Sequence, residues 1–323
     1  MNIIFFITLI ILWMIFSYYT FIINRKNELD NLSMVKTSFG DISYIDINSN
    51  KQEVILFCTG GGVGLDSVNA FKWLKTSDFR VICINRPGYN KLNIANDFET
   101  HADIFYEVLI GLNINTELIN VFGVSMGGAS AISYTRKYGA KKLLLWSAIT
   151  TSYLPNEEAV NSALGKLVMN SQMKDIISYF LMYAAKLMPS TTFVEFVYQS
   201  ADISKEDLKK YANTMMKNKD LKAEFLAFVK SMTPMSYIYP GMMKEIEMAK
   251  EFNGHLSEIK TPCYAIHSIL DKDVPIAHLD YLAKLLPYAK TVRVKCLGHY
   301  VWWGPESEEV INNSLSFLKH GND

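Results

Sequence analysis

Short hydrophobic runs separated by amphipathic stretches dominate the chain between residues 34 and 150. The runs are continuously apolar and do not alternate with polar residues, which is typical of strands buried on both faces of a parallel sheet. Helical spacing follows most runs, with short links between. This alternation predicts βαβ units with helices on both faces of the sheet. The expected buried strands are EVILFC, RVICIN, LINVFGVS and KLLLWSA, preceded by a hairpin of MVKTSFG and DISYIDIN.

The pattern changes after about residue 150. Residues 151–258 are helical in character and contain no clear buried strand. The strand pattern then resumes with TPCYAIHSI and, after a helical stretch, with TVRVKCLG. An all-helical insertion of roughly a hundred residues, a size in keeping with a separate layer, therefore interrupts one sheet. We expect an α/β core in two parts, residues 34–150 and 259–323, and a helical cap or lid at residues 151–258.

The N-terminal segment differs from both of these regions. Residues 2–24 carry no charged side chain, and about twenty apolar residues span a bilayer as a helix. A cleavable signal peptide would have a basic start, a shorter apolar stretch and a small-residue cleavage site, which this segment lacks. We therefore expect an uncleaved transmembrane anchor at residues 1–25, followed by a polar linker at residues 25–33. Because Arg25 and Lys26 follow the apolar stretch directly, the positive-inside rule predicts a single-pass membrane protein with a cytoplasmic main domain.

Composition argues against other classes of protein. Half of the 323 residues are hydrophobic, and 32 Lys and Arg residues balance 32 Asp and Glu residues without a basic cluster. Nucleic-acid binding therefore has no electrostatic basis. The four cysteines lie far apart in apolar runs and form no CxxC pair, so buried, reduced thiols are expected and no metal site.

The sharpest local motif is GVSMG at residues 123–127, a G-x-S-x-G pattern between an expected buried strand and an expected helix. In that context the serine occupies a strained strand-to-helix turn that exposes its hydroxyl, and the glycines let neighbouring backbone approach. The backbone N–H of Met126 and the start of the helix would face negative charge developing on a substrate oxygen. The motif predicts Ser125 as a nucleophile.

A nucleophilic serine needs a histidine as base, and the histidine needs a carboxylate to orient it. Of the six histidines, His299 follows the last expected strand, at the edge where open α/β sheets place their sites. It also gives the chain order serine, acid, histidine. Asp271 and Asp273 follow the strand TPCYAIHSI, so one of them is the expected partner. The other is expected to be a solvated loop acid or a turn former.

A glycine cluster, TGGGVG at residues 59–64, follows the first buried strand. Backbone N–H groups there would point into the same pocket and supply a second donor to an oxyanion. The spacing matches neither a dinucleotide-binding G-x-G-x-x-G motif nor a P-loop. A plain flexible turn remains the alternative.

Taken together, these features resemble the α/β-hydrolase fold family, in particular its branch with a helical cap, over residues 35–150 and 258–320. RPGY at residues 86–89 is similar to the family's R-x-G-aromatic loop. DKDVP at residues 271–275 is similar to its D-x-x-V-P run, and Gly298-His299 to its terminal Gly-His pair.

The resemblance also implies individual roles. The register of the D-x-x-V-P run selects Asp271 as the acid, and the alignment makes Gly61 the second oxyanion donor beside Met126. Thr59 stands where the family usually has histidine, and Ser268 where glycine usually precedes the acid. The first departure leaves Gly62 as an alternative donor.

The implied activity is that of a serine hydrolase that cleaves a carboxylic ester through an acyl-enzyme on Ser125, without a metal or a cofactor. Eleven of the fifteen methionines lie in the expected cap. Methionine adapts its shape, so with the membrane anchor a hydrophobic or lipid-like ester is expected, although these methionines would also suit an ordinary helical core. The alternatives are an amidase, a thioesterase or a C–C bond hydrolase with the same triad, and a non-catalytic binding protein of the same fold.

Overall fold

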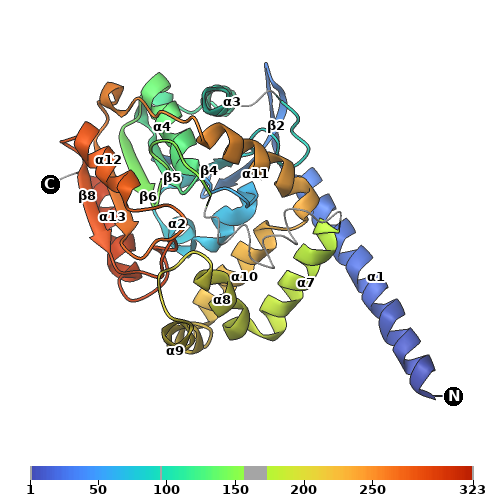
Figure 1. Ribbon diagram of the computed structural model, residues 1–323. Coiled ribbons are helices and arrows are strands. Elements are labelled where there is room, and N and C mark those ends of the chain that lie inside the picture. Colours follow the sequence, from blue (N-terminus) through green and yellow to red (C-terminus); the bar gives the residue numbers. More distant parts are fainter. Residues whose placement is uncertain (1, 95–96, 156–172, 322–323) are drawn as a thin grey trace.

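The strands form one sheet that places the ends of its central members side by side. The computed structural model describes residues 2–94, 97–155 and 173–321 (Figure 1). In this part of the chain the sheet has eight strands in the order β1-β2-β4-β3-β5-β6-β7-β8. Their bounds are Met34–Thr37, Gly40–Ile47, Val54–Cys58, Arg80–Ile84, Asn120–Val124, Lys142–Trp146, Cys263–Ser268 and Lys290–Val294 for β1 to β8.

The sheet is mostly parallel, as predicted. Only β1 and β2 run antiparallel, β1 to β2 and β2 to β4, and every other neighbouring pair is parallel. All residues of β3, β5, β6 and β7 are buried, which explains their continuously apolar sequence. The carboxyl ends of these strands therefore meet at one edge, where loops from distant parts of the sequence lie together.

Helices cover both faces of the sheet, also as predicted. Alternate residues of β3 point to opposite sides: Phe57 belongs to one hydrophobic core and Leu56 to the other. The core around Leu56 includes side chains from α3 (Phe98–Gly111), α4 (Gly127–Tyr138) and α12 (Ala277–Leu285). The core around Phe57 includes side chains from α2 (Lys72–Thr76) and α13 (Ser307–His320).

Helices also fill the described part of the expected cap. They are α7 (Lys174–Leu187), α8 (Pro189–Tyr198), α9 (Lys205–Met215), α10 (Lys219–Ser231) and α11 (Met235–Ala249). The Ser204 side chain accepts a hydrogen bond from the Asp207 amide and so caps the start of α9. Residues 156–172 of the expected cap lie outside the described residues.

The N-terminal helix is longer than predicted. Helix α1 runs without a break from Asn2 to Asp30, so the stretch expected to be a polar linker is helical. Its first half projects from the rest of the molecule (Figure 1), with exposed apolar side chains at residues 5–16. Its second half packs on α7, where the Phe21 ring lies 5.5 Å from the Tyr179 ring. By length and composition, the segment Phe5–Asp30 is long and apolar enough to cross a membrane.

The aromatic core beneath the central strands gives a test of this packing. Phe122 on β5 is fully buried and stacks on Phe57 with ring centroids 5.0 Å apart. We expect Phe122→Ala to lower the free energy of unfolding by roughly 3 to 5 kcal/mol, because it removes a large buried ring and leaves a cavity. Thermal unfolding in detergent measures this loss. Leu118→Ala, at a side chain that is 62% exposed, is the control and should change stability by less than about 0.5 kcal/mol.

Candidate active site

The turn at Ser125 joins the central strand β5 to helix α4. Ser125 has a φ of +55°, a left-handed conformation that is uncommon outside glycine. Two hydrogen bonds to the neighbouring β6 region hold it: its amide donates to the Trp146 carbonyl at 3.0 Å, and its carbonyl accepts from the Ile149 amide at 3.0 Å. The strain is therefore built into the end of the sheet, as the G-x-S-x-G motif predicts.

Glycine at position 127 lets this turn lie against the adjacent strand. A Cβ atom added to Gly127 would lie 2.1 Å from the carbonyl oxygen of Cys58, the last residue of β3. No side chain fits into that space, so the helix can start here only with glycine. The close approach brings α4 and the loop after β3 together next to Ser125.

Asp271 and His299 form a tight pair on the loops after β7 and β8. The Nδ1 atom of His299 lies 2.8 Å from the Oδ2 atom of Asp271. The other carboxylate oxygen of Asp271 accepts the amides of Asp273 and Val274, each at 2.9 Å. Burial alone would raise the pKa of Asp271, but the neighbouring imidazoles outweigh it and lower that pKa to about 2. Asp271 is thus an ionised carboxylate that orients the imidazole of His299.

The same pair sets the basicity of His299. Burial would lower the pKa of this imidazole, but the charge and hydrogen bond of Asp271 raise it to about 9, with a smaller contribution from Asp273. His299 accepts a proton readily and becomes a free base in the alkaline range.

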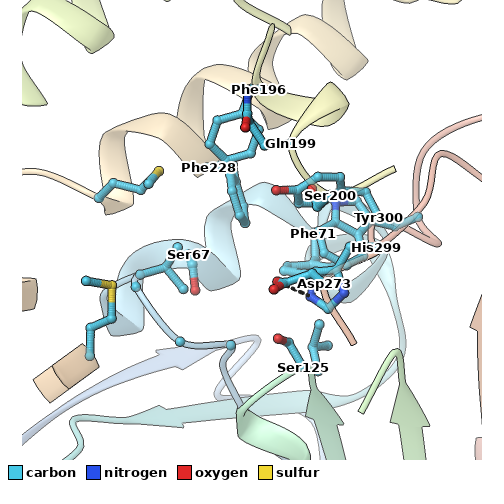
Figure 2. A pocket seen from close by; sticks show the side chains of 18 of the residues that line it. Ser67, Phe71, Ser125, Phe196, Gln199, Ser200, Phe228, Asp273, His299 and Tyr300 are labelled. Carbon is cyan, nitrogen blue, oxygen red and sulfur yellow. Dashed lines mark ion pairs between the residues drawn. The ribbon is translucent and has the colours of Figure 1, made fainter. Parts of the chain in front are cut away.

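Asp273 lies closer to the base than the sequence predicts. Its Oδ2 atom is 3.8 Å from Nε2 of His299 (Figure 2). Its Oδ1 atom accepts a hydrogen bond of 2.8 Å from the Tyr153 hydroxyl. It is therefore not simply a solvated loop acid. Among the described residues, the Ser125 hydroxyl has no hydrogen-bond partner, whereas the Asp273 carboxylate lies within ion-pair distance of Nε2.

A second histidine supports the acid, and sequence reasoning does not find it. His267 on β7 is buried, with its Nε2 atom 2.7 Å from the Val274 carbonyl oxygen and 3.3 Å from Oδ2 of Asp271. Its only sequence signal is that a histidine stands in an otherwise apolar strand. It holds the acid loop against the end of the sheet.

The cap also reaches the acid and base loops. The carbonyl oxygen of Ser200, between α8 and α9, accepts the amides of His299 at 3.1 Å and Lys272 at 3.2 Å. The Asp202 amide donates to the Leu270 carbonyl at 2.8 Å. This cap segment, residues 200–202, therefore fixes the backbone on which Asp271 and His299 stand.

The glycine loop (residues 59–64) passes over the serine turn. A Cβ atom added to Gly61 would lie 3.3 Å from Cβ of Met126, so the loop touches the residue after the nucleophile. The Gly62 amide donates to the Tyr89 hydroxyl at 3.3 Å. The Gly61 amide has no hydrogen-bond partner in the described part of the chain, which makes it the better of the two candidate donors.

Arg86, from the R-x-G-aromatic loop, clamps this glycine loop from below. Its guanidinium donates to the carbonyl oxygens of Thr59, Gly60 and Val63 at 2.9 to 3.0 Å. It also forms a buried ion pair of 2.7 Å with Glu245 on cap helix α11. Burial raises the pKa of Glu245 to about 7, and the charge of Arg86 opposes that rise.

Ser125, His299 and Gly61 line one cavity of about 330 Å³ (Figure 2). Most of its remaining lining is apolar and comes from both the core and the cap, including Phe71, Phe196, Phe228, Met232, Met242 and Trp302. Asp271 lies behind His299, and Met126 is buried at the start of α4. The structure thus brings the five predicted site residues together around one apolar pocket.

Comparisons with known proteins agree with this architecture. No protein-family model matches the chain. The uncharacterized hydrolase YcgS of Bacillus subtilis is 21% identical over 276 residues, 84% of this chain and 93% of that protein. An α/β-hydrolase fold protein from Nakamurella multipartita superposes with a TM-score of 0.77 at 18% identity, over 90% of this chain and all of that one. The chain has the α/β-hydrolase fold.

A second solved structure of this fold is an esterase from Exiguobacterium antarcticum. It is 16% identical, with a TM-score of 0.59 over 89% of this chain and 99% of the esterase. At this level of identity the α/β-hydrolase likeness establishes the fold, and the chemistry has to be argued from the site itself.

The position of Asp273 predicts a measurable effect on pH dependence. Its carboxylate raises the pKa of His299, so Asp273→Asn should lower that pKa. The rising limb of the curve of rate against pH should then move to lower pH by up to about one unit. The rate of covalent labelling of Ser125 by a fluorophosphonate, measured from pH 6 to 10, follows this limb. Asp280→Asn, an exposed carboxylate on α12 paired with Arg293, is the control and should leave the limb in place. A limb unmoved in Asp273→Asn would show that this carboxylate does not act on His299.

Proposed function

We propose that this protein is a serine hydrolase that cleaves carboxylic esters through an acyl-enzyme on Ser125. The observation that carries the proposal is that the strained serine and the Asp271–His299 pair face one apolar cavity beside the Gly61 amide. A strained serine without a base, or a base without a donor to an oxyanion, would not carry out acyl transfer.

The reaction follows from these positions. Neutral His299 takes the hydroxyl proton of Ser125 as its oxygen attacks the ester carbonyl, and the N–H groups of Gly61 and Met126 bind the resulting oxyanion. The imidazolium, stabilised by Asp271, gives its proton to the leaving alcohol, and the acyl group stays on Ser125. Water then loses a proton to His299 and attacks the acyl-enzyme. Collapse of the second tetrahedral intermediate returns the proton to Ser125 and releases the carboxylic acid.

The cavity lining supports a hydrophobic acyl group. Phe196, Phe228, Met232 and Met242 contribute apolar side chains from the cap. Other cap methionines, such as Met182, Met215 and Met235, are buried in hydrophobic clusters, so the methionine-rich composition serves the core as well as the pocket. An amide, a thioester or a C–C bond beside a carbonyl would use the same triad, and these bonds are the alternatives to an ester.

The N-terminal helix supports membrane attachment. Residues 5–16 of α1 are exposed and, apart from Thr8, apolar, and such a surface is stable in lipid and not in water. We infer a single-pass anchor, with the catalytic domain on the cytoplasmic side because Arg25 and Lys26 follow the apolar stretch. A hydrophobic substrate and a membrane-held enzyme are mutually consistent.

The nucleophile is tested by covalent labelling. The detergent-solubilised full chain should react with a fluorophosphonate probe, and Ser125→Ala should abolish labelling because the attacking oxygen is lost. His299→Ala should slow labelling by roughly 10³-fold or more, since the base is removed. Ser307→Ala and His320→Ala, both on α13 and away from the cavity, are matched controls that should label like the wild type. A folded wild type that does not react would favour a non-catalytic binding protein.

The substrate class is tested by varying the acyl chain. With p-nitrophenyl esters, kcat/KM should rise from acetate toward octanoate by up to about fourfold per methylene, as each buried CH₂ contributes about 0.8 kcal/mol. Met232→Gln, in the cavity wall, should flatten this rise. Met173→Gln, at an exposed methionine outside this cavity, should not. A kcat/KM that falls with chain length would contradict a hydrophobic acyl site.

A further inference from the structure

The anchor helix contributes a buried charge to the catalytic domain. Arg25 stands where α1 enters the folded body, and only 4% of its surface is exposed. Its guanidinium pairs with the carboxylate of Asp66, and its Nε–H donates to the Thr233 carbonyl at 3.0 Å. A membrane-flanking arginine that served only topology would lie in the headgroups or in water, whereas this one lies inside the protein.

Asp66 is the partner whose charge Arg25 neutralises. It belongs to the short helix η1 (Leu65–Ala70), which begins directly after the glycine loop. The carboxylate is buried, and its Oδ1 atom has no hydrogen-bond partner among the described residues. Burial raises the pKa of Asp66, while Arg25 and, more weakly, Lys230 on α10 lower it. The buried thiol of Cys83 on β4 also lies near this carboxylate but carries no positive charge. Arg25 is therefore the principal counter-charge of Asp66.

The ion pair acts on the end of the glycine loop. A Cβ atom added to Gly64 would lie 2.8 Å from Oδ1 of Asp66, and the Gly64 amide donates to the Ser231 carbonyl at 2.9 Å. One residue earlier, the Val63 carbonyl is bound by Arg86. Arg86 therefore binds the loop that carries the Gly61 amide directly, and Arg25 binds Asp66, two residues beyond the end of that loop.

Further contacts bind this end of α1 to the cap. Glu28 pairs with Arg25 at 3.0 Å and with Lys230 at 2.8 Å, and Lys26 pairs with Asp175 on α7 at 3.2 Å. The end of the anchor is thus bound to the cap and, through Asp66, to η1 directly after the glycine loop. A flexible tether would show no such set of contacts.

We propose that Arg25 is a positioning residue for the oxyanion loop, so that the membrane helix is an integral part of the active site and is not a removable leader. This inference rests on the proposed serine-hydrolase function. Loss of Arg25, by substitution or by cleavage of the helix, would leave Asp66 buried without its counter-charge. An ionised carboxylate would then pull η1 toward water and move the Gly61 amide away from the oxyanion.

The experiment uses four full-length variants in detergent: Arg25→Met, Asp66→Asn, the double variant Arg25→Met/Asp66→Asn, and Lys26→Met. Lys26 is the matched control, because it is the next residue on the same helix but pairs with Asp175 and not with the loop. For each variant the rate constant of fluorophosphonate labelling is measured from pH 6 to 10, together with the labelled fraction. A folding defect lowers the labelled fraction, whereas a displaced donor lowers the rate constant of the folded protein.

The expected result depends on pH. In Arg25→Met, Asp66 is neutral at low pH and tolerated, but it ionises as the pH rises, so the rate relative to wild type should fall with increasing pH. The loss should reach at least about tenfold at alkaline pH, since removal of one oxyanion donor costs roughly 10² to 10³ in rate. The double variant has no carboxylate to ionise, so the ratio of its rate constant to that of the wild type should be independent of pH. Above neutrality this ratio should be higher than the ratio for Arg25→Met. Asp66→Asn should also give a pH-independent ratio, and Lys26→Met should stay within about twofold of wild type.

Two outcomes would overturn the proposal. One is an Arg25→Met rate constant equal to that of the wild type at every pH. The other is a pH-dependent loss that the double variant does not relieve. Both require a wild type that labels at Ser125, so they differ from a failure of the proposed function, in which the wild type itself does not react.

Discussion

The buried guanidinium of Arg86 is the interaction on which the rest of the site depends. It binds three carbonyl oxygens of the glycine loop and the carboxylate of Glu245 in the cap. Removal of one partner from a buried ion pair costs about 3 to 5 kcal/mol, because the remaining charge stays in the protein without compensation. The loop, the cap helix α11 and the core can therefore hold their positions only together.

This interdependence explains how the strained turn at Ser125 is maintained. The left-handed turn at Ser125 would relax in an isolated peptide, at a gain of about 1 to 2 kcal/mol. In the folded chain β6 binds the turn on one side, and the glycine loop, fixed by Arg86, lies on the other. Strain at the reactive serine is sustained by the stability of the surrounding sheet and cap.

The sequence predicted those parts of the site that local motifs encode. Ser125 and Asp271 follow strands that continuous apolar runs identify, and the chain order serine, acid, histidine pairs them with His299. The choice of Asp271 over Asp273 comes from the resemblance to the D-x-x-V-P run. Contacts between distant segments were not predictable in this way. Asp273 near His299, His267 behind Asp271 and the cap segment 200–202 each depend on how loops meet in space.

The expectation of a polar linker at residues 25–33 failed for the same reason, because it too depends on a contact between distant segments. A run of charged residues after an apolar helix is usually solvated, and RKNELDNLS shows no sign that its arginine is buried. The charge is buried because Asp66, forty-one positions later, lies directly opposite it. Composition distinguishes charged from apolar residues, but only the tertiary structure distinguishes a solvated charge from a paired one.

The pocket combines chemistry from the core with selectivity from the cap. Strand ends supply the proposed nucleophile, acid and base, whereas cap helices supply much of the apolar wall. Hydrogen bonds from the acid and base loops to Ser200, and the ion pair of Glu245 with Arg86, tie the two layers together at both sides of the serine. A rearrangement of the cap that admitted a substrate would therefore also move the loops that carry Asp271, His299 and Gly61. Under the proposed function, substrate entry and the alignment of the catalytic groups are therefore coupled.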